Sequence, residues 1–118
     1  MMRLKAHDIW HEYFKAHDAF LMPTNFIPAF PHDHGPQRGR RLKTTQGERR
    51  YDDQFKWISF ATLTGCPATI APVGRTKEGL PVGIQIMGSL FEDATPIDIA
   101  ARMRDVVGGF EPPPMFSS

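Results

Sequence analysis

The sequence has little material for a disulfide, a membrane span or a strongly charged surface. Its 118 residues include one cysteine, Cys66, which cannot form an internal disulfide. No apolar run approaches the roughly 20 residues that cross a bilayer. The 14 basic and 13 acidic side chains leave a net charge of +1, which gives no electrostatic reason to expect nucleic acid or anionic lipid. No apolar leader follows Met1, so we predict a cytoplasmic protein without a nucleic-acid or membrane partner.

The chain also lacks the short motifs that mark many enzymes. Neither GxGxxG nor GxxxxGK[ST] occurs, and no serine lies in a GxSxG turn. His32 and His34 could point the same way from an extended segment, but no third ligand follows at a suitable spacing. His7 and His11 are four residues apart without the HExxH pattern. These histidines are either solvated or hydrogen-bonded side chains or ligands of a metal, and the first interpretation is favoured, so we assign no metal-binding or cofactor-binding residue.

Two further features each leave a functional and a structural interpretation open. Cys66 follows an expected helix end, whereas a nucleophilic thiol is activated at a helix N-terminus, which favours a buried structural cysteine over a cysteine hydrolase. A basic cluster lacks the interleaved aromatic residues that stack on single-stranded nucleic acid. It is either a solvated loop or a surface that docks on an acidic partner. The cluster comprises Arg38, Arg40, Arg41, Lys43, Arg49 and Arg50.

The sequence does contain enough apolar side chains for one core. Hydrophobic residues make up 41% of the chain, and we predict a single domain over 1–118. Apolar residues recur at helical spacing near the start and predict a helix over about 4–17. The short apolar run 19–22 predicts a buried strand that Pro23 terminates. Segment 25–50 is rich in Pro, Gly and Arg without periodicity, which predicts a long exposed loop.

The second half of the chain predicts two helices and a hairpin. Residues 53–64 are apolar on most sides, which indicates a helix buried by neighbours and ended by Gly65. Two apolar runs joined by a five-residue connection predict a β-hairpin over about 68–88. Thr95 as the capping residue predicts a further helix over about 96–107.

An extended tail over 111–118 is predicted to follow this last helix, because three consecutive prolines disfavour a helix there. We therefore expect an α/β fold, in which a small mixed sheet containing the hairpin is packed by three helices.

Several motifs resemble the C-terminal part of amidase signature family enzymes. The most specific are LTGCPA at 63–68 and GLPVGIQIMG at 79–88. The similarity also extends over Trp10, Tyr13–Phe14, Ala19–Thr24, Pro28–Pro31, Pro72–Gly74, Phe91–Asp93 and Gly108–Phe110. The resemblance implies a fragment of the amidase signature fold, which has a mixed, largely parallel sheet between helices. Members of that family cleave amide C–N bonds without a cofactor, by a Ser–cis-Ser–Lys triad.

The resemblance does not extend to the catalytic part of the family. The Gly/Ser-rich segment and its upstream lysine match nothing in this chain. None of its lysines, which are Lys5, Lys15, Lys43, Lys56 and Lys77, matches the triad motif. We therefore assign no catalytic residue and predict an amidase-family C-terminal fragment that is inactive on its own.

The alternative is a non-enzymatic binding or regulatory module that self-associates or docks on another amidase chain. In the family, this segment packs beside a much larger catalytic portion, so an isolated chain is expected to keep an uncovered apolar face. Either that face or a free strand edge would support a homo-oligomer. The candidate face comprises Phe55, Trp57, Phe60, Ile84 and Ile86.

Overall fold

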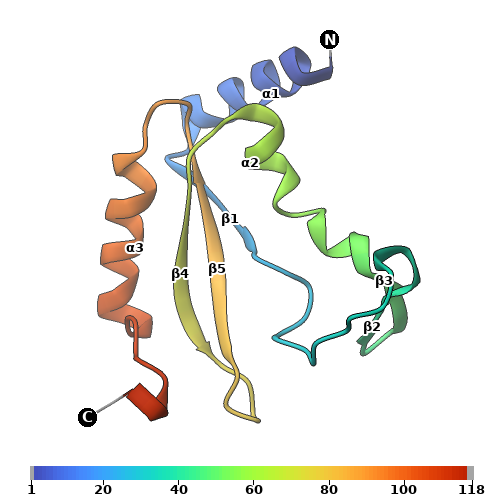
Figure 1. Ribbon diagram of the computed structural model, residues 1–118. Helices are drawn as coiled ribbons and strands as arrows, with labels where there is room; N and C mark the ends of the chain where they lie inside the picture. Colours follow the sequence, from blue (N-terminus) through green and yellow to red (C-terminus); the bar gives the residue numbers. More distant parts are fainter. Residues whose placement is uncertain (1, 117–118) are drawn as a thin grey trace.

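The computed structural model describes residues 2–116, which fold around a three-stranded sheet (Figure 1). The strands are β1 (Ala19–Pro23), β4 (Ala68–Arg75) and β5 (Pro81–Gly88), in the order β1–β5–β4. The α/β class and the hairpin at 68–88 are confirmed. Both strand pairs are antiparallel, so the expected mixed pairing is not found among these residues. The short connection between β4 and β5 allows no other pairing, since parallel neighbours need a long crossover.

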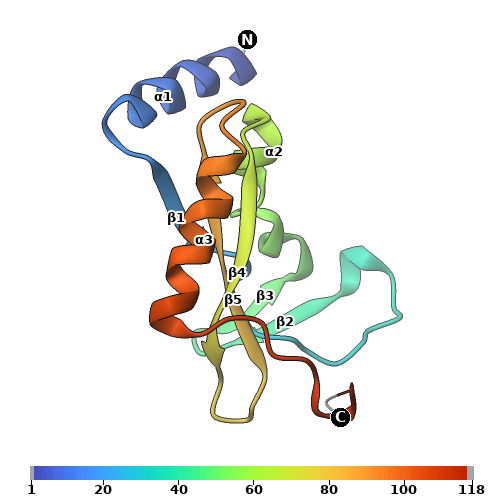
Figure 2. The same cartoon turned by 90° about the vertical axis from the view of Figure 1, so that its left-hand side faces the viewer.

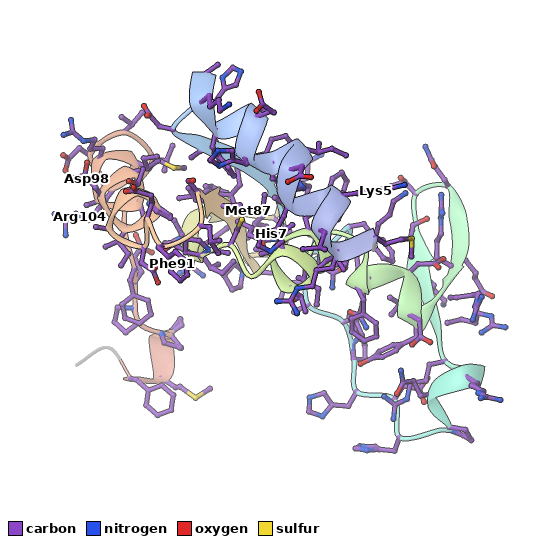
Figure 3. All side chains as sticks on the ribbon, turned by 90° about the horizontal axis from the view of Figure 1, so that it is seen from above. Lys5, His7, Met87, Phe91, Asp98 and Arg104 are labelled. Atoms are coloured by element: carbon purple, nitrogen blue, oxygen red, sulfur yellow. The ribbon has the colours of Figure 1, made fainter. Side chains whose placement is uncertain are left out.

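Two helices pack on the sheet from opposite sides. Helix α3 (Ala94–Val107) lies against β4 and β5, as Figure 2 shows. Its approach is close at Gly88, where a Cβ atom would lie 2.8 Å from Pro96 Cγ. Helix α1 (Met2–Ala16) crosses the other side near one end of the strands, above Met87 (Figure 3). The helices predicted over 4–17 and 96–107 are thus confirmed, with starts two residues earlier in both.

The expected capping role of Thr95 is wrong. Helix α3 begins at Ala94, and no side chain caps its first turn. A tight turn leads straight into the helix, because the Glu92 amide donates to the Ser89 carbonyl and the Thr95 amide donates to the Glu92 carbonyl. The Thr95 amide therefore takes part in the first hydrogen bonds of the helix. Thr95 lies inside the first turn and is not the residue that precedes it.

The helix predicted over 53–64 is present only in its second half. Residues Tyr51–Phe55 form a 3₁₀ helix, η2, and α2 spans only Ser59–Thr64. Phe55, Ile58 and Leu63 are all exposed, so too few apolar side chains of the segment are covered to stabilise a continuous helix. Gly65 ends α2 as predicted, with φ of 73° and its amide bonded to the Ala61 carbonyl at 2.8 Å.

The prediction of a long loop over 25–50 is wrong for its second half. The segment contains a 3₁₀ turn, η1 (Gln37–Gly39), and an antiparallel hairpin of β2 (Arg41–Thr44) and β3 (Gly47–Arg50). A two-residue turn joins the strands, and Gly47 follows it with φ of 110°. The Thr44 hydroxyl donates to the Gly47 carbonyl at 2.7 Å, which closes the turn.

The predicted extended tail over 111–118 also departs from the structure. A short 3₁₀ helix, η3 (Pro114–Phe116), forms within it, and residues 117–118 lie outside the described residues. Since a 3₁₀ helix can begin at proline without losing a backbone hydrogen bond, the proline run does not keep the whole tail extended.

The core lies on both faces of the central strand. Ile86 and Met87, neighbours on β5 that point to opposite faces, are both fully buried. Met22 and Ala71 on the flanking strands complete the apolar core of the sheet. Ile86, which we expected on an uncovered face, is therefore interior, because α3 covers its side of the sheet.

The chain is more open than a compact domain of its size. It exposes 9080 Å², whereas a folded monomer of 13.3 kDa typically exposes about 6,450 Å². The radius of gyration is 16.5 Å, against about 13.5 Å for a compact domain of this length. Much of the apolar surface is therefore uncovered. Within residues 2–116, no helix has the length and apolar character needed to cross a membrane.

Candidate functional site

A large cavity lies between the β2–β3 turn and the segment that leads into α2. It has a volume of about 700 Å³, which is within the usual range of ligand pockets. Phe26, Phe55 and Trp57 form its apolar walls. Arg49 and Lys56 bring positive charge to the same cavity, so that it offers both apolar contacts and charged groups.

The polar groups around this cavity are arranged for binding rather than for nucleophilic attack. Asp52 Oδ1 accepts a hydrogen bond from Gln37 Nε2 at 2.7 Å. The Ser59 hydroxyl donates to the Lys56 carbonyl at 2.6 Å, so its proton is held by the backbone. A nucleophilic serine instead needs an adjacent base that accepts this proton. Ser59 is therefore not an activated nucleophile.

The structure brings Cys66 close to histidines that are distant in sequence. Cys66 is half-buried and lines a cavity of about 150 Å³ together with His7, His11 and Ser89. The fully buried cysteine that we expected is thus a partly accessible one, because it lies in the turn between α2 and β4. The Cys66 amide donates to the Thr64 hydroxyl at 3.3 Å. Spacing in the sequence could not reveal this neighbourhood, since α1 and the turn are far apart along the chain.

The other candidate pair, His32 and His34, is exposed. The ring centroids of His32 and His34 are 6.0 Å apart. No group of three or more His, Cys, Asp or Glu side chains within residues 2–116 is arranged to hold a metal ion.

The basic cluster is divided between the two faces of the β2–β3 hairpin. Arg41 lies directly opposite Arg50, and Leu42 lies opposite Arg49. The first pair is exposed, whereas Leu42 is buried and Arg49 borders the large cavity. Arg40 is held differently, with its guanidinium carbon 5.1 Å from the centroid of the Tyr51 ring. The cluster is therefore not one continuous binding surface.

The pKa of Glu12 is shifted, and this residue lies away from these cavities. The Lys15 ammonium donates a hydrogen bond to Glu12 at 2.7 Å and lowers the pKa of that carboxyl. Both side chains are exposed on α1. The shift therefore reflects a surface ion pair and indicates no site.

The fold is that of part of an amidase. The described elements superpose on a solved amidase with a TM-score of 0.73 at 22% identity, covering 90% of this chain and 23% of the other. The structure of a glutamyl-tRNA(Gln) amidotransferase subunit from Thermotoga maritima gives the same TM-score at 28% identity, covering 92% and 23%.

Sequence similarity leads to the same class of protein. The Amidase family model matches residues 1–96. The chain is 32% identical over 105 residues to fatty acid amide hydrolase from Arabidopsis thaliana, covering 87% of this chain and 16% of that protein. It is 31% identical over 93 residues to a glutamyl-tRNA(Gln) amidotransferase subunit from Xanthobacter autotrophicus, covering 79% and 17%. The chain belongs to the amidase family, and it spans less than a quarter of the length of these relatives.

Proposed function

We propose that this chain is a structural part of an amidase-type hydrolase and that it does not hydrolyse amides by itself. The observation that carries the proposal is the difference in coverage. The match to solved amidases takes in 90–92% of this chain but 23% of each of those proteins. The chain thus corresponds to one portion of a larger catalytic fold.

The chemistry of the described residues supports the same proposal. The hydroxyl of Ser59, at the large cavity, donates a hydrogen bond to a backbone carbonyl. The half-buried Cys66 shares a small cavity with His7 and His11, but no hydrogen bond joins its sulfur to either imidazole within residues 2–116, so neither ring is held in place to accept its proton. The apolar walls and charged groups around the large cavity can contribute to binding, and the reacting groups would come from the remainder of an amidase fold.

A second candidate is the non-enzymatic module that self-associates or docks on another amidase chain. Its support is the surface area, which is well above that of a compact monomer of this mass. Of the apolar face that we expected, Phe55 is exposed, while Trp57, Phe60 and Ile84 are half-buried. Homo-oligomerisation and a cytoplasmic location stay predictions.

The proposal is tested by incubating the purified chain with a panel of amides and esters, beside its Cys66→Ser variant. We expect no turnover by either protein. Hydrolysis that survives in Cys66→Ser would show an active site that we have not assigned. Hydrolysis that disappears in this variant would identify a cysteine hydrolase, and either result would overturn the proposal. Sedimentation as a clean monomer at high concentration would count against self-association.

A further inference from the structure

We propose that the exposed face of the β2–β3 hairpin is a docking surface for an acidic, extended segment of another protein. We call this surface the hairpin face, and it comprises Arg41, Lys43, Glu48 and Arg50. None of these residues lines the large cavity. The inference therefore goes beyond the proposed function, and it gives a role to the exposed part of the basic cluster.

The strand register places these four side chains on one side of the hairpin. Arg41 lies opposite Arg50, and Lys43 lies opposite Glu48. Because successive residues of a strand point to opposite faces, the two pairs share a face and Leu42 between them points to the other. Leu42 is buried, whereas all four members of the hairpin face are exposed. Figure 1 shows the hairpin lying apart from the three-stranded sheet. The hairpin face is thus open to a partner.

Arg41 and Arg50 form a cross-strand pair of like charges. The Tyr51 amide donates to the Arg40 carbonyl at 3.3 Å, so the neighbouring pair is one without mutual hydrogen bonds. In such pairs the Cα atoms are only about 4.5 Å apart, and the side chains lie closer than in hydrogen-bonded pairs. Like charges directly opposite each other are destabilising. A carboxylate bound between the two guanidinium groups would replace this repulsion by attraction.

No carboxylate of the described residues compensates these charges. Lys43 and Arg50 form no ion pair within residues 2–116, although Glu48 lies opposite Lys43. Arg41 Nη1 donates to two backbone carbonyls, at 3.2 and 3.0 Å. These bonds hold the guanidinium at the hairpin without neutralising it. A side chain that is already held in place loses less conformational entropy when a ligand binds.

The spacing of the cations fits an extended peptide. A strand rises about 3.4 Å per residue, so Arg41 and Lys43 are about 7 Å apart along β2. Every second residue of an extended peptide repeats at the same distance and points to one side. A segment with Asp or Glu at alternate positions can therefore place one carboxylate at Lys43 and the next between Arg41 and Arg50. Exposed ion pairs are individually weak, so the binding is expected to be reversible and sensitive to salt.

The composition of the hairpin face favours a peptide over other anionic partners. The face has no aromatic side chain on which a base could stack, and no apolar side chain that could insert into a bilayer. Glu48 also lies on it and would repel a uniformly anionic lipid surface or phosphate backbone. A peptide can present a neutral or basic residue at that one position. The mixed charges are therefore complementary to a peptide with a defined pattern of acidic residues.

The test measures the binding of fluorescein-labelled peptides to the purified chain by fluorescence anisotropy. The probe alternates glutamate with threonine over about ten residues, and a control peptide of the same composition has its glutamates in adjacent pairs. In the extended control, glutamates on one side are four residues apart, which is too far for neighbouring cations of β2. We expect the probe to bind about threefold more tightly, and added salt to weaken it. Equal affinities would overturn the fit to an extended acidic segment.

Arg50→Gln and Arg49→Gln form a matched pair of variants. The two arginines are neighbours on β3, both are exposed, and they lie on opposite faces of the hairpin. Each substitution removes one positive charge. Arg50→Gln should weaken binding of the alternating peptide about fivefold, and Arg49→Gln less than about twofold. Equal losses would show attraction to the net charge of the chain and would overturn the docking surface.

Glu48→Gln gives a readout of the opposite sign on the same face. The substitution removes a repulsive carboxylate, so the alternating peptide should bind about threefold more tightly. An unchanged affinity would show that the peptide does not lie on the hairpin face. Arg50→Gln also removes the like-charge pair, so its hairpin amides should be at least as protected from hydrogen exchange as those of the parent chain. That measurement separates lost binding from a lost hairpin.

Two further probes decide between classes of partner. Vesicles of phosphatidylcholine with phosphatidylserine, and a single-stranded DNA oligonucleotide, are tested with the same variants. We expect neither to bind more tightly than the alternating peptide. Tighter binding of either probe, weakened in Arg50→Gln but not in Arg49→Gln, would assign the face to a lipid or nucleic acid and would overturn the proposal. None of these measurements depends on hydrolysis, so their failure is distinct from a failure of the proposed function.

Discussion

The three-stranded sheet and the segment over residues 24–58 are stabilised in different ways. The sheet has a core of its own, in which Met22, Ile86 and Met87 are buried. In the segment 24–58, which we call the arm, Leu42 is the only buried side chain of the described residues. Figure 1 shows the arm extending away from the sheet. Burial of apolar side chains can therefore keep the sheet folded, whereas it cannot keep the arm folded.

Local polar and aromatic contacts hold the arm in place. Asn25 Nδ2 donates to Gln54 Oε1 at 3.0 Å, which links the start of the arm to η2. The rings of Phe30 and Tyr51 are 6.3 Å apart in an edge-on arrangement. Such contacts contribute about 1 kcal/mol each, so the arm should open at a much lower free energy than the sheet. The sheet is therefore the stable element, and the arm is joined to it and relies on contacts with neighbouring residues.

The largest effect that we expect comes from the centre of the sheet. Ile86→Ala should lower the free energy of unfolding by about 2–5 kcal/mol, because it leaves a cavity in a fully buried site. Leu42→Ala should instead release the arm and leave the main transition nearly unchanged. Urea denaturation followed by circular dichroism measures the loss of stability in Ile86→Ala. Hydrogen exchange of the arm measures its release in Leu42→Ala. If Ile86→Ala does not fold, Ile86→Val should still cost about 1 kcal/mol.

Equal losses of global stability in Ile86→Ala and Leu42→Ala would contradict the comparison, since they would show that the arm and the sheet unfold as one unit.

A smaller effect should follow from the contact between β5 and α3. Gly88→Ala places a methyl group 2.8 Å from Pro96 Cγ and should cost about 1–3 kcal/mol through the required displacement of the helix. Gly74→Ala is the matched control, because nothing lies within 4 Å of the added atom. We expect the control to change stability by less than about 0.5 kcal/mol. A Gly88→Ala variant as stable as the control would mean that α3 is not packed closely on β5.

Sequence reasoning found the sheet elements better than the arm for a physical reason. The hairpin over 68–88 and the first and last helices have long apolar patterns, and these are the residues that the fold buries. The strands β2 and β3 have four residues each and bury little beyond Leu42, so they leave almost no periodic signal. The helix predicted over 53–64 lacks its first half for a related reason. Its apolar side chains led us to expect a buried helix, but the fold covers too few of them to stabilise one.

The sequence allowed a better prediction of the family than of the candidate site. LTGCPA and GLPVGIQIMG are continuous motifs, and they sufficed to indicate an amidase. The large cavity depends on which segments become neighbours in the fold. Gln85 alternates with apolar residues like any strand residue, and its side-chain amide is buried without a hydrogen-bond partner among the described residues only once β1 and β4 lie beside β5. Cys66 and His7 likewise meet only through the crossing of α1 over the turn.

The most direct test of the account is native-state hydrogen exchange of the arm and of β5 in the purified chain. We predict that the amides of the β2–β3 hairpin exchange at a much lower free energy of opening than the amides of β5, because the sheet has a buried core and the arm does not. Amides of the arm that exchange at the same free energy as those of β5 would contradict the claim that the two regions are stabilised in different ways.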